Sequence, residues 1–171
     1  MRGVIMRGRS DKVTLFASPP ELATEMGLSS TIVVIKDLIK NAKETIFITC
    51  YEFSSDELAD EIITAVAREV NVDVYIDESD SGSPVNRISR SKDNLEKMED
   101  VGVRIVRQNN SMRNHTKAII VDSDSGVIGS ANFTWSGLNK NIEIGLKIEG
   151  PSCELFMDKF ISGLEAMNGN E

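Results

Sequence analysis

The sequence predicts an α/β fold in which a central mixed β-sheet is flanked by helices on both faces. Short stretches with strand-like composition alternate along the chain with stretches whose apolar residues recur at helical spacing. The 171 residues match the size of one domain, and no linker or repeat divides them. Hydrophobic residues make up 40% and charged residues 27%, which is typical of a globular protein with its own core. We therefore expect one domain over residues 1–171, with residues 1–11 a loosely ordered N-terminal segment.

The first elements are a strand, a helix and a buried strand. Residues 12–17 alternate as a strand does, and the pair of prolines that follows removes backbone donors and ends it. Apolar residues at helical spacing then predict a helix that Ser29 or Ser30 caps and that runs to about residue 43. Residues 45–53 are rich in β-branched and aromatic residues and predict a buried strand.

The middle of the chain continues the alternation and contains one long polar stretch. Ser54 and Glu57 stand in capping-box positions for a helix to about residue 69, and residues 72–76 predict another strand. Residues 77–92 contain acidic, then Gly/Ser/Pro, then basic residues and predict a loop that is long for a compact domain. We expect a helix at residues 93–100.

The last third is predicted to be mostly strand. Residues 103–106 form a short strand, and two further strands at residues 115–121 and 126–130 are joined by the polar turn between them. Residues 142–148 predict another strand, and residues 152–167 predict an amphipathic C-terminal helix.

Charge is unevenly distributed, although the net charge is −8. Residues 101–121 contain no acidic residue and include Arg104, Arg107, Arg113 and Lys117. A local basic stretch of this kind suits a phosphate-binding surface, while a solvated face is the alternative that a charge run alone favours. The candidate contacts for a nucleic-acid backbone are Arg87, Arg90, Arg107 and Arg113.

Several classes of protein are disfavoured. No apolar run approaches the length of about 20 residues that a membrane span needs, and the N-terminus has no signal-peptide core. Cys50 and Cys153 have no partner pattern and are interpreted as small buried hydrophobes. A zinc site would need more ligands than these two cysteines and the single histidine supply. We expect a cytoplasmic protein with no membrane, metal or cofactor.

One segment, starting at Asn114, contains the residue types that phosphate chemistry needs. His115 and Lys117 are two residues apart on a predicted strand, so both side chains lie on the same face. Ser130 and Asn132 follow the end of the next strand, and Glu143 is near the beginning of the one after. Neighbouring strands can thus bring a nucleophile, a cation, neutral donors and a carboxylate to one rim.

This segment resembles the HKD motif of the phospholipase D superfamily. The pattern H-x-K-x4-D-x6-G-S-x-N is present in full, at His115, Lys117, Asp122, Gly129, Ser130 and Asn132. Glu143 lies where the family places a carboxylate that bonds the catalytic imidazole. The order of predicted elements before the motif also matches one domain of the family, so the resemblance covers roughly residues 12–165.

The resemblance implies a phosphohistidine mechanism without a metal. In the family one imidazole attacks phosphorus, and a second imidazole from a second motif protonates the leaving oxygen and then activates water. By this resemblance His115 is the nucleophile or acid, Lys117, Ser130 and Asn132 bind the phosphate, and Glu143 orients the imidazole. Asp122 and Gly129 are expected to be structural.

This chain has one motif and one histidine, whereas the mechanism uses two imidazoles. A homodimer with twofold symmetry would place two copies of His115 at one cleft. Small single-motif members of the family are mostly nucleases of this kind, which makes a DNA or RNA phosphodiesterase the leading hypothesis.

Two alternatives remain open at the level of the sequence. The same motif serves phospholipid phosphodiesterases and phosphatidyl transferases, and the chain could also be a nucleic-acid-binding module whose site is unused. Trp135, the only tryptophan, fits a stacked base or packing in the core or dimer interface.

Overall fold

The structure, a computed structural model, describes residues 10–77, 85–108 and 113–168, and the side chains of residues 85–90 and 168 lie outside that description. Its eight strands are β1 (Lys12–Ser18), β2 (Ser29–Ser30), β3 (Thr45–Cys50), β4 (Asn71–Asp77), β5 (Arg104–Gln108), β6 (Lys117–Val121), β7 (Ser125–Gly129) and β8 (Glu143–Glu149). Its six helices are α1 (Pro20–Glu25), α2 (Thr31–Lys40), α3 (Asp56–Val66), α4 (Val85–Asp100), α5 (Trp135–Asn139) and α6 (Ser152–Asn168).

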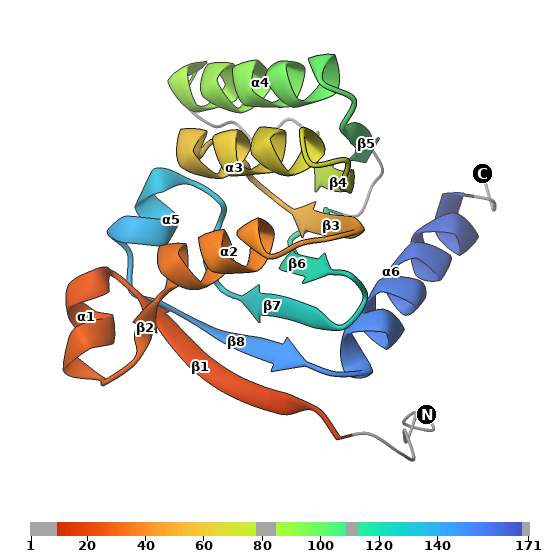
Figure 1. Cartoon of the computed structure of the whole chain (residues 1–171). Helices are drawn as coiled ribbons and strands as arrows, with labels where there is room; N and C mark the ends of the chain where they lie inside the picture. The colour runs from red at the N-terminus through yellow and green to blue at the C-terminus, as the bar shows by residue number, and fades with distance from the viewer. Residues whose placement is uncertain (1–9, 78–84, 109–112, 169–171) are drawn as a thin grey trace.

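All eight strands belong to one mixed sheet in the order β2-β1-β8-β7-β6-β3-β4-β5 (Figure 1). The half formed by β3, β4 and β5 is parallel, because helices α3 and α4 carry the chain back between consecutive strands. The other half is built from the antiparallel pairs β3–β6, β6–β7, β7–β8 and β8–β1, and the short β2 pairs in parallel with β1 at its edge. The predicted mixed sheet is therefore confirmed.

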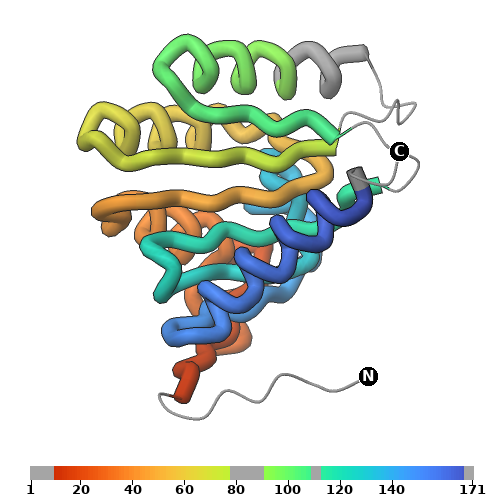
Figure 2. The backbone as a smooth tube through the Cα atoms, turned by 90° about the vertical axis from the view of Figure 1, so that its right-hand side faces the viewer, coloured from red at the N-terminus to blue at the C-terminus, as the bar shows by residue number. Residues whose placement is uncertain are grey.

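Helices cover both faces of this sheet, as the sequence predicts. Helices α1 to α5 lie on one face, and α6 crosses the other face diagonally (Figures 1 and 2). The larger core lies under α2 and α3 and includes Ile39, Ile48, Ile62 and Ile119. A smaller cluster lies under α6, where Phe47, Tyr75 and Ile120 meet the helix. No helix in the described ranges is long and apolar enough to cross a membrane.

Some boundaries differ from the sequence-based expectation. Helix α4 begins at Val85, so much of the expected loop at residues 77–92 is helix: its Ser- and Arg-rich start lacks the apolar periodicity that would have indicated one. Helix α3 is capped by Ser55, whose Oγ accepts from the Leu58 backbone N–H, and not by Ser54. The backbone N–H of Ser54 donates instead to the Phe133 carbonyl, a long-range contact that a local capping pattern cannot reveal.

Three short elements had no sequence signal strong enough to predict them. Helices α1 and α5 have six and five residues, which is under two turns, and β2 has only two residues. Strand β6 begins at Lys117 and not at residue 115, so His115 precedes the ladder. The C-terminal helix α6 matches its expected range closely.

Candidate active site

Four strand ends meet at one edge of the sheet. Because β6 is antiparallel to both β3 and β7, its first residue, Lys117, lies beside the last residues of those strands. Lys117 pairs with Cys50 of β3, and Gly129, at the end of β7, pairs with Gly145 of β8. The topology therefore brings the motif residues of three segments to the same edge.

His115 and Lys117 are in direct contact at this edge. The Lys117 Nζ lies 3.0 Å from the His115 Nδ1 and donates to the His115 backbone carbonyl at 2.8 Å. The Tyr51 ring packs against the imidazole, with 4.7 Å between ring centroids. The Lys117 ammonium lies over the same Tyr51 ring. His115 itself is exposed, so a substrate phosphate can reach the imidazole. The sequence predicts both side chains on one face of a strand; they do lie together, but His115 precedes the strand.

A buried polar network holds the backbone on either side of His115. The Asn114 amide oxygen accepts from the backbone N–H of Thr116 at 3.2 Å, and its amide nitrogen donates to the Thr49 hydroxyl at 3.0 Å. The backbone N–H of Asn114 donates to the Asp77 carboxylate at 2.6 Å. Because buried polar groups are costly to leave unpaired, this network keeps the segment before β6 in one conformation.

Lys117 is a nearly buried lysine surrounded by acids. Burial lowers its pKa below the ordinary value, while Cys50, Glu143 and Glu52 act electrostatically in the opposite direction. Tyr51 and Glu52 belong to this site, yet sequence reasoning assigned them to the end of a buried strand. Their place at the site follows from the antiparallel pairing of β3 with β6, and a single sequence does not reveal that pairing.

Ser130 and Glu143 form a second group at the same edge. The Ser130 Oγ donates to the Glu143 carboxylate in a very short hydrogen bond, and the Ile144 backbone N–H donates to the same hydroxyl at 3.2 Å. The other Glu143 oxygen accepts from the Asn141 amide at 3.5 Å. Within the described part of the chain, the hydrogen bonds of Glu143 go to Ser130 and Asn141, and the expected bond to its own His115 is not formed.

Asn132 lies just beyond β7 with its amide oxygen buried. That oxygen has no hydrogen-bond partner among the described residues. The next residue, Phe133, ties this segment to the segment after β3, because its N–H donates to the Glu52 carbonyl and its own carbonyl accepts from Ser54 and Ser55. The Asn132 amide is thus placed beside the site and retains unused hydrogen-bonding capacity.

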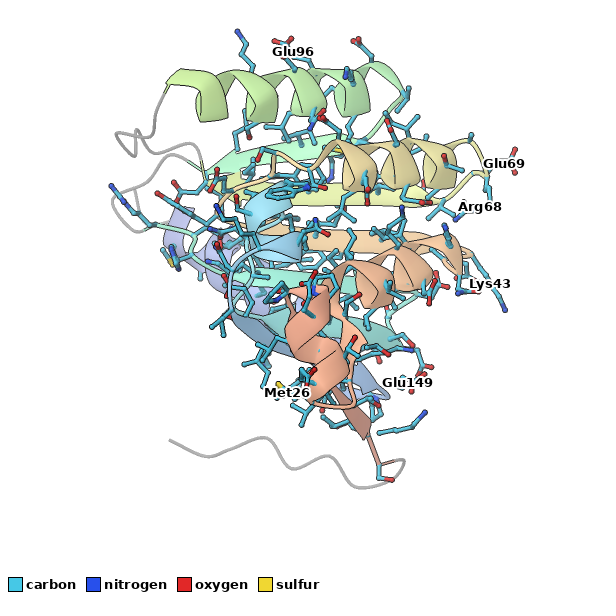
Figure 3. All side chains as sticks on the ribbon, turned by 90° about the vertical axis from the view of Figure 1, so that its left-hand side faces the viewer. Met26, Lys43, Arg68, Glu69, Glu96 and Glu149 are labelled. Carbon is cyan, nitrogen blue, oxygen red and sulfur yellow. The ribbon has the colours of Figure 1, made fainter. Side chains whose placement is uncertain are left out.

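The two motif positions expected to be structural have clear packing roles. The Asp122 carboxylate accepts from the backbone N–H groups of Lys43, Glu44 and Thr45 at 2.8–3.3 Å. It lies at the opposite end of β6, on the edge where Figure 3 shows Lys43, Glu69 and Glu149. A Cβ on Gly129 would lie 3.0 Å from the Ile144 carbonyl oxygen, so glycine permits the close approach of β7 to β8.

The candidate arginine contacts are only partly placed. Arg113 is exposed two residues before His115, whereas Arg107 lies on β5, three strands from β6, in a bidentate ion pair with Glu99. Arg87 and Arg90 fall on α4, but their side chains lie outside the described residues. Of the four candidate arginines, Arg113 is therefore the one nearest to His115 in sequence.

Comparison with protein families gives a match over most of the chain. A family model described as "Cardiolipin synthase, PLD-like domain" matches residues 35–167. DISARM protein DrmC of Bacillus paralicheniformis is 32% identical over 128 residues, which are 74% of this chain and 52% of DrmC. Cardiolipin synthase A of Serratia proteamaculans is 27% identical over 93% of this chain and 32% of its own length. The chain therefore spans about half of the first relative and a third of the second.

Solved structures of similar size share the fold. A phospholipase D family member, Nuc from Salmonella typhimurium, superimposes with a TM-score of 0.73 at 25% identity, covering 90% of this chain and 93% of Nuc. NucT from Helicobacter pylori superimposes with a TM-score of 0.69 at 18% identity, covering 90% of this chain and 95% of NucT. In both cases almost the whole of each chain is included.

Proposed function

The chain belongs to the phospholipase D superfamily, and on that basis we propose that it is a metal-independent phosphodiesterase that hydrolyses nucleic acid. The observation that carries the proposal is the contact between the exposed His115 imidazole and the nearly buried Lys117 ammonium. A nitrogen nucleophile beside a fixed cation is what attack on an anionic phosphodiester requires, because the cation offsets charge that develops on the non-bridging oxygens.

The roles of the side chains follow from their positions. We assign the attack on phosphorus to Nε2, the His115 nitrogen that does not contact Lys117; its lone pair is free only when Nδ1 holds the ring proton, so the contact between Nδ1 and the Lys117 Nζ opens before attack. Attack forms an N–P bond and breaks the bond to the leaving oxygen, which takes a proton from an acid. Hydrolysis of the phosphohistidine by water then restores the imidazole. Lys117 and Asn132 are suited to bind the non-bridging oxygens, and Ser130 adds a hydroxyl beside them.

A single copy of the chain lacks two parts of this mechanism. The chain contains one histidine. Once that imidazole acts as the nucleophile, a single copy has no second imidazole to protonate the leaving oxygen. An attacking Nε2 also needs Nδ1 to carry the proton, and the Lys117 ammonium is a donor that cannot accept it. Glu143 does not bond its own His115. We therefore propose a homodimer in which the second copy supplies the imidazole acid and Glu143 of each copy serves the imidazole of the other.

Nucleic acid is favoured over lipid by the local distribution of charge. The acid-free segment that ends in the motif, with Arg113 exposed next to the site, suits a polyanion.

The second candidate function is hydrolysis or transfer of a phospholipid headgroup. It is favoured by the matching family model and by the relatives named cardiolipin synthase A and, over 71% of its length, phospholipase D of Rickettsia bellii. The chemistry at His115 would be the same, so the two functions differ only in what binds around the phosphate.

A substrate comparison in excess EDTA tests the proposal. Purified wild type and His115→Ala are incubated at low salt with labelled single- and double-stranded DNA, RNA and vesicles that contain phosphatidylglycerol. We expect wild type to cleave nucleic acid and His115→Ala to lose at least about 10³-fold of that rate. Lys43→Ala, at the opposite edge of the sheet, serves as the control and keeps full activity.

Other outcomes would change the assignment. Turnover of vesicles without cleavage of oligonucleotides would support the lipid function, and binding without turnover of any phosphodiester would support a binding module. Loss of cleavage when EDTA is added would contradict a metal-independent mechanism.

A further inference from the structure

Trp135, the only tryptophan of the chain, lies on the surface and not in the core. The residue is 62% exposed, and no other aromatic residue whose side chain the structure describes is as exposed. A packed tryptophan buries a large apolar area, so leaving it in water forgoes that stabilisation. The exposed position rules out packing in the core, which the sequence left open.

A rigid mount holds Trp135 in its exposed position. Trp135 is the first residue of α5, and the N-cap Thr134 accepts from the Gly137 N–H at 3.1 Å. The Thr134 N–H donates to the Asn132 carbonyl at 2.8 Å. A Cβ on Gly137 would clash with that same carbonyl oxygen, and the Gly137 carbonyl accepts from the Ser18 hydroxyl at 2.9 Å. The short helix is therefore fixed to β1 on one side and to the Asn132 backbone on the other.

This mount places Trp135 close to the phosphate site. Helix α5 lies beyond the end of β7, the strand that leads into Ser130 and Asn132 (Figure 1). Three residues of chain span at most about 11 Å, so the Cα of Trp135 lies within that distance of the Cα of Asn132. A stacked strand rises about 3.4 Å per nucleotide. Bases within about three nucleotides of a phosphate bound at Asn132 are therefore within reach of the indole.

The composition of α5 suits a nucleobase better than a lipid surface. Its other residues are buried, as Gly137 and Leu138 are, or polar, so the helix has no apolar face that could enter a membrane. Lys140, at the C-cap of α5, and Arg113 are exposed cations. Proteins that bind single strands combine cations along the backbone with aromatic faces on which bases stack.

We propose that Trp135 is a stacking face for an unpaired base of the substrate, within about three nucleotides of the phosphate that is cleaved. This inference rests on the proposed function, because it takes that phosphate to belong to a nucleic acid. A base inside a duplex has both faces covered by its neighbours, so the indole can stack only on an unpaired base. Trp135 therefore makes the site favour single strands over duplexes, with little dependence on the base, because every base has a π-face.

The single tryptophan makes the contact directly measurable, since the tryptophan fluorescence of the protein comes from Trp135 alone. The His115→Ala variant, which prevents cleavage during the titration, is mixed with a short oligodeoxythymidine or with a blunt duplex of the same length. We expect the single strand to quench the fluorescence and the duplex to leave it nearly unchanged.

Three further variants, each in the His115→Ala background, separate stacking from apolar contact. The Kd for the labelled single strand is measured by fluorescence anisotropy. Trp135→Leu keeps an apolar side chain but loses the ring, and should raise this Kd about 5- to 100-fold. Trp135→Phe keeps a ring and should recover most of the affinity. The control is Val101→Ala, which removes an exposed apolar side chain just before β5, at the edge of the sheet opposite the site, and should leave the Kd unchanged.

Circular dichroism and thermal melting establish that each variant folds. Binding without quenching, or a Trp135→Leu variant that binds the single strand as tightly as Val101→Ala does, would overturn the inference. So would a free protein whose tryptophan is shielded from acrylamide, or an emission that vesicles shift and oligonucleotides do not. Failure of the proposed function is a separate result: quenching and loss of affinity as expected, with no cleavage of nucleic acid by wild type.

Discussion

Lys117 is the residue at which folding and function make opposite demands. Its side chain is nearly buried at the start of β6, and this burial lowers the pKa of the ammonium group. The acids around it, Glu52 and Glu143, reduce but do not cancel that cost. We propose that Lys117 binds the substrate phosphate, because direct contact with an anion would further offset the cost of burying the ammonium.

Replacing Lys117 should therefore separate stability from activity. We expect Lys117→Met to lower the rate of hydrolysis by about 10²–10³-fold, because the fixed cation is lost. The midpoint of thermal unfolding should stay the same or rise, because the buried charge is removed. Steady-state kinetics and calorimetry on the same preparation measure both; a large fall in the unfolding temperature would instead indicate a structural role.

The lowered pKa of Lys117 also predicts the alkaline side of the pH profile. The charged lysine is the active form, so hydrolysis should fall as pH rises through a pKa that lies below the ordinary lysine value. Lys117→Arg, which stays charged, should lose activity overall but should not show this alkaline decline. An unchanged decline in Lys117→Arg would assign the titration to another group.

At the scale of elements, Asp122 joins the end of β6 to the beginning of β3. Its carboxylate accepts from three consecutive backbone N–H groups at residues 43–45, in the connection between α2 and β3. Burial alone would raise the pKa of this carboxyl, but the three amide donors together hold it below the usual value. Asp122 also has a positive φ of 51°, which aspartate and asparagine tolerate better than alanine does.

Asp122 substitutions should reduce stability more than chemistry. We expect Asp122→Ala to lower the free energy of unfolding by roughly 2–3 kcal/mol and Asp122→Asn by less, because the amide keeps one acceptor. Since the folded-state pKa is lowered, this contribution is present above the ordinary aspartate pKa and is lost as pH falls through the folded value. Urea titrations at neutral and acid pH check both predictions; a destabilisation by Asp122→Asn that persists at low pH would contradict the role of the carboxylate charge.

The sequence is informative about elements and motif, and less so about contacts between them. The long strands, α2, α3 and α6 follow from periodicity and caps, and His115, Lys117, Ser130 and Glu143 do converge at one edge as their positions at strand ends predict. Tyr51 and the Asn114 network depend on the register of β3 against β6, which no local pattern encodes. The start of α4 could not be predicted because it lacks an apolar stripe.

At the scale of the whole molecule, a shared site makes activity depend on pairing. If each cleft uses the imidazoles of two copies, a mixed pair of wild type and His115→Ala is defective. Random exchange in an equal mixture should then reduce the activity per wild-type chain to about half, and a ninefold excess of His115→Ala to about a tenth.

An inert protein added at the same concentration provides the control for this mixing experiment and should leave wild-type activity unchanged. Activity per wild-type chain that is unaffected by His115→Ala would show that each copy works alone and would contradict the shared site.

The central claim is that His115 is the nucleophile, and the most direct measurement is to trap its covalent intermediate. Wild type is mixed with the substrate identified above, quenched within milliseconds at alkaline pH, where phosphohistidine survives, and digested for mass spectrometry. We predict an adduct on the His115 peptide in which the phosphorus still carries the retained part of the cleaved substrate, and which appears before the product and decays as product accumulates. An adduct on another residue, or undiminished hydrolysis by His115→Ala, would contradict the account.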